Sequence, residues 1–185
     1  MTARGVNGLR DTDKSLQVFF DQCAASSSQE CAFYSPTSSE IKARLDKLYS
    51  IVKAEPIAAQ TTFGYGYDYV DFSTLRSAVF FSLYNPYLSS APLAAALKEL
   101  EQGNGTAVVT LLNLLQGTIT KPECNCTQPA KTVIPSDEPE MAILCGDGQV
   151  MPEKSPAALY QKYLMMVQNF SSFADVWSFK SAQCS

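Results

Sequence analysis

The sequence contains no histidine among its 185 residues. An imidazole is the usual base for serine and cysteine nucleophiles, so neither a Ser-His-Asp nor a Cys-His arrangement can be assembled from this chain. A Gly-x-Ser-x-Gly turn, a phosphate-binding loop and a dinucleotide-binding glycine pattern are also missing. Carboxylate pairs such as Asp68 with Asp71 remain, but such pairs are usually solvated loop acids. We therefore expect no catalytic residue and no cofactor in this chain.

Long apolar runs and clusters of positive charge are missing too. The longest apolar candidates, residues 78–81 ("AVFF") and 141–145 ("MAILC"), are far shorter than the roughly 20 residues that a membrane-spanning helix needs. The formal net charge is −4, without a dense group of lysines and arginines. We expect neither a membrane nor a nucleic acid as a partner.

The composition is that of one globular domain with few charges. Hydrophobic residues make up 46% of the chain and charged residues 17%, which indicates that part of the surface is normally covered. We expect a single domain over residues 1–185. Residues 117–139 are rich in proline, threonine and charge and have no periodicity, so they are predicted to form an irregular loop insertion.

Most of the chain has the apolar spacing of amphipathic helices. Residues 38–52 place Ile41, Leu45, Leu48 and Val52 on one face, behind a Ser38 or Ser39 cap. The same reasoning predicts helices over residues 13–24, 71–84, 91–103, 106–116, 155–167 and 171–179.

Two prolines and a glycine mark expected helix boundaries. The helix of residues 71–84 should begin at Asp71 or Ser73 and end before Asn85-Pro86. Pro92 is expected in the first turn of the next helix, and Gly103 just beyond its end.

A tyrosine-rich stretch, "TTFGYGYDYVDFS", separates two of the expected helices. It is either a surface loop or a short strand whose tyrosines line a cavity. Tyr65 and Tyr67 are candidate substrate-binding residues on the second interpretation. The fold class expected is mainly α, with at most one or two short strands.

Six cysteines and three acceptor sequons favour a secretory route, although the opening residues "MTARGVNGLRDTDK" lack the apolar core of a signal peptide. The sequons lie at Asn104, Asn125 and Asn169.

Cysteine spacing favours disulfides over a metal site. Cys23 and Cys31 close a short loop just after a helix and are predicted to pair. Cys124-Asn-Cys126 lacks the four-ligand spacing of a zinc site, and no histidine is present to complete one, so we expect no metal.

Five segments in order carry a resemblance to a known family. Together they resemble the cap region of the tripeptidyl aminopeptidase-like α/β-hydrolases, which are secreted serine exopeptidases, and especially of fungal-type members. The resemblance covers residues 9–184 and rests on the segments "TDKSLQVFFDQCAASSSQECAF", "YGYDYVDFSTLRSAVFFSLYNPY", "PLAAALKELEQGN", "AILCGDG" and "FADVWSFKSAQC".

In that family the nucleophile elbow lies before the region that matches Asp11, and the acid and the histidine follow the region that matches Cys184. The resemblance therefore implies a helical cap, or lid, without its catalytic flanks. The implied partner is a hydrolase core absent from this chain, and the implied substrate of the complete enzyme is a peptide. Acids in the caps of related exopeptidases hold the free amino terminus of the substrate, which makes Asp147 a candidate substrate-binding residue.

The resemblance also implies a disulfide between Cys145 and Cys184. Cys124 and Cys126 are then left over, to pair with each other under strain or with another chain.

Two functions remain open at this point. The first is a cap fragment of a secreted serine peptidase, from a truncated gene, a split gene model or a decayed duplicate. The second is a stand-alone secreted, cysteine-rich helical binding protein, with a groove between helices for a peptide or an apolar ligand.

Overall fold

The computed structural model describes residues 9–60, 66–116 and 155–182. The chain divides into two compact units, residues 14–120, here called the helical unit, and residues 1–13 with 121–185, the terminal unit. The fold is mainly helical with one two-stranded antiparallel sheet in the part that the structure describes, which confirms the expected class. That residues 1–185 form one domain stays a prediction, and the loop expected at 117–139 lies outside the described residues.

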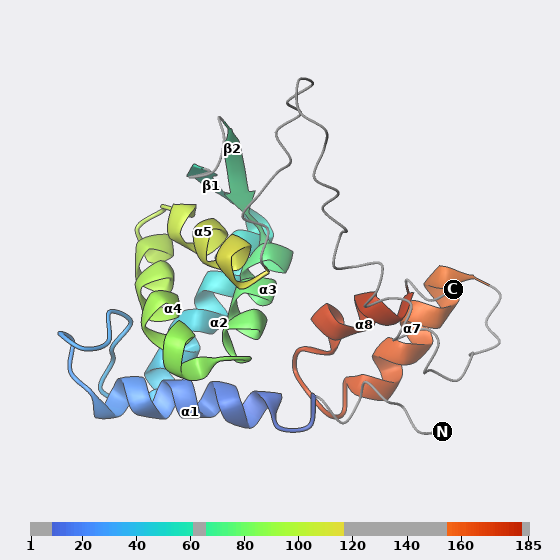
Figure 1. Ribbon diagram of the computed structural model, residues 1–185, viewed down its shortest axis with the longest axis horizontal. Helices are drawn as coiled ribbons and strands as arrows, with labels where there is room; N and C mark the ends of the chain where they lie inside the picture. Colours follow the sequence, from blue (N-terminus) through green and yellow to red (C-terminus); the bar gives the residue numbers. More distant parts are fainter. Residues whose placement is uncertain (1–8, 61–65, 117–154, 183–185) are drawn as a thin grey trace, which may run out of the picture. The chain divides into compact units, whose positions relative to one another are not determined.

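The helical unit gathers its helices around a small hairpin. Figure 1 shows α2, α3, α4 and α5 packed together, with β1 and β2 beside α5. All but the first two residues of α1 belong to this unit. The elements are α1 (Thr12–Ala25), α2 (Ser38–Ala54), β1 (Ile57–Gln60), β2 (Tyr67–Val70), α3 (Phe72–Ser82), α4 (Pro86–Glu101) and α5 (Thr106–Leu115).

The core of the helical unit follows the predicted apolar stripes. The stripe of α2 is buried as expected from its spacing, and α3, α4 and α5 contribute leucines and valines from their facing sides. The fully buried leucines of this core are Leu45, Leu48, Leu75, Leu93, Leu97 and Leu100.

The tyrosine-rich stretch contains a strand rather than only a loop. β2 pairs with β1 in a register that places Val70 opposite Ile57 and Tyr67 opposite Gln60. Val70 and Ala59 are buried while Tyr67 and Tyr69 are exposed, so the hairpin has one inner and one outer face.

The helix starts differ in detail from the predicted ones. The cap of α2 is Thr37, not Ser38 or Ser39, because Thr37 has the extended backbone of a cap and its Oγ1 accepts from the Glu40 N–H at 3.2 Å. Asp71 caps α3, accepting from the Thr74 N–H at 2.7 Å, which decides between the two predicted starts.

Helix α4 starts about a turn and a half earlier than predicted. Pro86 occupies its first turn after Asn85, and the N–H groups of Leu88 and Ser89 both donate to the Asn85 carbonyl. Pro92 therefore lies inside the helix instead of in its first turn, which corrects the prediction.

A disulfide and an arginine hold the segment between α1 and α2. Cys23 and Cys31 are bonded, as predicted, with their Cα atoms 5.5 Å apart. Arg44 of α2 then donates to the carbonyls of Phe33 and Tyr34 at 3.1 and 2.8 Å, and its guanidinium lies 4.1 Å above the Phe33 ring centroid.

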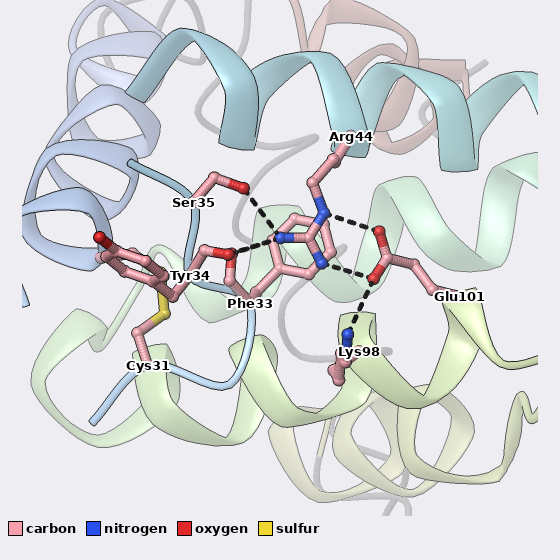
Figure 2. A network of polar contacts seen from close by, with 8 residues as sticks. Cys31, Phe33, Tyr34, Ser35, Arg44, Lys98 and Glu101 are labelled. Carbon is pink, nitrogen blue, oxygen red and sulfur yellow. Dashed lines mark hydrogen bonds and ion pairs between the residues drawn. A yellow bond between two sulfur atoms is a disulfide. The ribbon is translucent and has the colours of Figure 1, made fainter. Parts of the chain in front are cut away.

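The same guanidinium reaches α4. Arg44 makes a bidentate ion pair with Glu101, and Lys98 lies 3.8 Å from the same carboxylate (Figure 2). One side chain thus joins α2, the segment that follows the disulfide and the end of α4.

The terminal unit contains α7 (Pro156–Val167) and α8 (Ala174–Ala182), which pack against each other. Ser155 caps α7 as its predicted start requires, accepting from the Ala158 N–H. Helix α8 begins three residues later than predicted. Ser172 donates its N–H to Asp13 at 2.9 Å, and the Phe173 N–H donates to the Ser171 hydroxyl, so this stretch forms a turn before the helix.

Candidate functional site

A pocket of about 770 Å³ lies between the hairpin, α4 and α5 of the helical unit, and we call it the hairpin pocket. This volume is typical of small-molecule and short-peptide sites. The pocket is open to solvent and mostly apolar. It is lined by Ala58, Ala59, Gln60, Tyr67, Pro92, Ala95, Ala96, Glu99, Gly103, Asn104, Thr106, Ala107, Thr110, Leu111 and Leu114.

One stripe of α4 forms a wall of the pocket. Pro92, Ala95, Ala96 and Glu99 recur at the spacing that places side chains on one face of a helix. Leu93, Leu97 and Leu100 of α4 lie on the adjacent face and are buried, while Glu101 reaches Arg44 on another side. Ala95 and Ala96 leave space in this stripe, because a stripe that faced the core would have larger residues such as leucine at these positions.

The turn between α4 and α5 forms the floor. Gly103 ends α4 in the left-handed conformation (φ 85°), and its N–H donates to the Leu100 carbonyl while the Asn104 N–H donates to the Glu99 carbonyl. These two bonds are the Schellman pattern, which favours glycine at this position.

The turn also covers the outer edge of β1. The Gly105 N–H donates to the Ala58 carbonyl at 3.1 Å, and the Gln60 N–H donates to the Thr106 hydroxyl at 3.0 Å. The start of α5 is thereby tied to the hairpin. Gly105 approaches the hairpin so closely that an added Cβ would lie 2.7 Å from Val70 Cγ2 of β2 and 3.0 Å from the Ala58 carbonyl oxygen of β1.

The polar groups of the pocket centre on Glu99 and Asn104. The Asn104 side chain donates from Nδ2 to Glu99 Oε2 at 3.1 Å and accepts at Oδ1 from the Thr106 N–H at 3.0 Å. Both ends of this amide are therefore engaged, and the amide holds the carboxylate of the half-buried Glu99 at the pocket wall.

Of the residues predicted to bind substrate, Tyr67 lines the hairpin pocket with 89% of its surface exposed. Tyr65 and Asp147 lie outside the described residues, as do Cys145 and Cys184. The structure therefore brings one of the three predicted binding residues to the pocket and does not describe the other two.

Two of the three sequons lie on described parts of the chain. Asn104 is exposed in the turn between α4 and α5, and Asn169 is exposed after the end of α7. Asn125 lies outside the described residues. Glycosylation at any of them stays a prediction.

A second surface feature lies at the corner between α3 and α4. Tyr87 is fully exposed, and Tyr84 and Leu88 expose 64% and 73% of their surface. We call these three residues the aromatic corner. Residues 77–97, which include it, contain no Asp, Glu, Lys or Arg.

Other kinds of site have no support in the described ranges. Residues 9–60, 66–116 and 155–182 contain no group of three or more His, Cys, Asp or Glu side chains that could hold a metal ion. Within the same ranges, no helix is long and apolar enough to cross a membrane.

Sequence reasoning missed Glu99 and Asn104 as pocket residues. The available signal was the alanine-rich stretch before Glu99 together with Gly103, which ends the helix one residue before Asn104. Comparison with known proteins adds no guide to the site, because no protein-family model, curated protein or solved structure matches the chain.

Proposed function

We propose that this chain is the helical cap of a secreted α/β-hydrolase resembling the tripeptidyl aminopeptidases. In this function the cap covers the pocket of a hydrolase core and selects peptide substrates, and the core supplies the nucleophile, the acid and the histidine. A lid of this kind excludes water and fixes the substrate, so that cleavage occurs at a set distance from its end.

The aromatic corner is the observation that carries this proposal. Large exposed apolar side chains close together in sequence, in a stretch of 21 uncharged residues, are typical of a surface that another protein part covers. The absence of histidine from the chain agrees with chemistry supplied from outside it.

The hairpin pocket favours the second candidate function. A site of about 770 Å³ within one helical unit needs no hydrolase core, so a stand-alone secreted binding protein for a peptide or an apolar ligand stays the alternative.

Sequencing the transcript on both sides of this chain tests the cap proposal. We expect a strand, a Gly-x-Ser-x-Gly turn and a helix upstream, and two strands followed by an acid and then a histidine downstream. An intact reading frame with its own signal sequence and no hydrolase segments on either side would contradict the cap proposal and favour the binding protein.

A labelling experiment tests the covered surface itself. A Y87C variant should react with a thiol reagent in this chain alone and be protected in the complete hydrolase. A K47C variant on the exposed side of α2 is the matched control and should react in both. Equal reactivity of Y87C in the two proteins would contradict a cap–core contact at the aromatic corner.

A further inference from the structure

Glu99 carries the only charge among the described residues that line the hairpin pocket. Among the ion pairs between described residues, none includes Glu99. The adjacent Lys98 lies with its Nζ 3.8 Å from the carboxylate of Glu101. The pocket therefore presents a carboxylate whose hydrogen-bond partner, Asn104, is neutral.

The rest of the wall suits a small apolar group. Ala95 and Ala96 of α4 and Ala107 and Leu111 of α5 line the pocket, and the hairpin adds Ala58. An apolar lining with one carboxylate complements a ligand that has one positive charge on an apolar body.

We propose that the hairpin pocket binds an ammonium group attached to a small apolar body, with Glu99 as its charge partner. Asn104 acts as a positioning residue, because its amide fixes the Glu99 carboxylate and is itself fixed by the Thr106 N–H. An ammonium has three donors for carboxylate and hydroxyl oxygens, and Thr106 and Thr110 of α5 also line the pocket.

This inference deepens the proposed function, because the free amino terminus of a peptide substrate is one source of such an ammonium. A free alkylamine is the other source. The two share the charge and the apolar body and differ in the peptide backbone that follows.

Calorimetric titration of the full chain with three probes tests the proposal without any variant. Trialanine amide has the ammonium, N-acetyl-trialanine amide lacks it, and propylamine has the ammonium without a peptide. We expect the acetylated probe to bind about tenfold more weakly than trialanine amide or not at all, because a charge-assisted contact is lost. Equal affinity of these two peptides, or no binding of either ammonium probe at millimolar concentration, would overturn the proposal.

The comparison of the two ammonium probes identifies the source. Tighter binding of trialanine amide assigns the pocket to a peptide terminus. Binding of propylamine at least as tight assigns it to a free amine, and either result supports the ammonium site.

Three variants locate the site. E99Q should weaken trialanine amide about tenfold, since the amide keeps the shape and removes the charge. A95L should weaken it too, because a leucine on this exposed position of α4 fills the pocket. E40Q removes the same charge from an exposed position on α2 and should leave the affinity unchanged. Unchanged affinity in both E99Q and A95L would overturn the assignment to this pocket.

The failure of this inference is distinguishable from the failure of the proposed function. If the flanking transcript encodes no hydrolase and trialanine amide still binds through Glu99, the ammonium site stands and the chain is a binding protein. If the transcript encodes a complete hydrolase and no ammonium probe binds, the ammonium site alone is overturned.

Discussion

At the scale of single residues, Arg44 makes contacts with several separate parts of the helical unit. It satisfies two loop carbonyls, pairs with Glu101 and covers the Phe33 ring. Three quarters of the Arg44 and Glu101 side-chain surfaces are buried. A lysine has neither the planar fork nor the number of donors that these partners need, so the position requires arginine.

We expect R44A to lower the free energy of unfolding by about 2 kcal/mol, because the loop carbonyls and Glu101 lose a charged donor. R44K should cost about half as much, since it keeps the charge. Denaturant titration followed by circular dichroism measures both. The matched control is K42A, which removes an exposed pair with Asp46 and should cost less than about 0.5 kcal/mol. Equal effects of R44A and K42A would contradict the role of Arg44.

Asp21 links α1 to α2 by accepting from the Ser38 hydroxyl at 2.6 Å. This hydrogen bond, with a second from Gln17, holds the pKa of Asp21 below its ordinary value of 3.8. A carboxylate whose pKa is lower in the folded protein stabilises it above the unfolded pKa, and this stabilisation is lost as pH falls through the folded pKa.

The D21N variant should therefore be less stable than the natural chain near neutral pH, and the difference should shrink as pH falls below 3.8. Urea midpoints of both proteins across the acid range measure it. A difference that stays constant over the whole range would show that the charge of Asp21 contributes nothing.

At the scale of elements, the turn between α4 and α5 determines whether the hairpin pocket exists. Gly103 and Gly105 are two residues apart but serve different purposes. Gly103 supplies a left-handed backbone in open space, whereas Gly105 allows close contact with β1.

We expect G105A to lower the free energy of unfolding by about 1–3 kcal/mol, because its Cβ would meet Val70 Cγ2 at 2.7 Å and the Ala58 carbonyl oxygen at 3.0 Å. Relief of these contacts requires a shift of the hairpin away from the start of α5. G103A is the comparison variant. It meets no atom within 4 Å and should cost about 1 kcal/mol from backbone strain alone.

The two variants also differ in what they do to the pocket. G105A should weaken binding of trialanine amide through the displaced wall, and G103A should weaken it less. Urea unfolding and calorimetry on the same samples separate the two effects. A G105A protein as stable as the natural chain would show that the hairpin leaves room for a Cβ at residue 105, which would contradict this prediction.

At the scale of the whole molecule, the chemistry of the chain is limited by its missing imidazole. We expect the purified chain to hydrolyse neither peptides nor esters and not to react with a serine-directed fluorophosphonate probe. Without a base to take its proton, a serine hydroxyl is a poor nucleophile near neutral pH. Mass spectrometry of the treated chain measures the reaction, and stoichiometric labelling of one serine would show that the chain contains an active site of its own.

Apolar spacing was sufficient to predict the helices of the helical unit. Ile41, Leu45, Leu48 and Val52 repeat at three and four residues, and only a helix places such residues on one buried face. The disulfide between Cys23 and Cys31 could also be predicted from the sequence, because two cysteines that flank a short segment are close to each other in a compact fold.

The start of α4 could not be predicted from local sequence signals, because two prolines gave competing start positions. Pro86 and Pro92 both suit the first turn of a helix, and the sequence does not rank them. The start at Pro86 adds to the helix the turn that contains Ser89, which is buried on the same side as Leu93 and Leu97. Burial of that face offsets the N–H that Pro92 lacks inside the helix.

By itself, the sequence determined the mainly helical class and the pairing of Cys23 with Cys31, and it contains no histidine. The hairpin pocket was decided by the tertiary structure alone. Its walls come from β1, α4 and α5, and Ala58 and Glu99 both line it although they are 41 positions apart in the chain. Periodicity reports which face of an element is apolar, but the facing partner depends on how the elements pack. Glu99 therefore appears in the sequence as one more helix-surface acid, and only the packing of α4 beside the hairpin places it at the wall of the hairpin pocket.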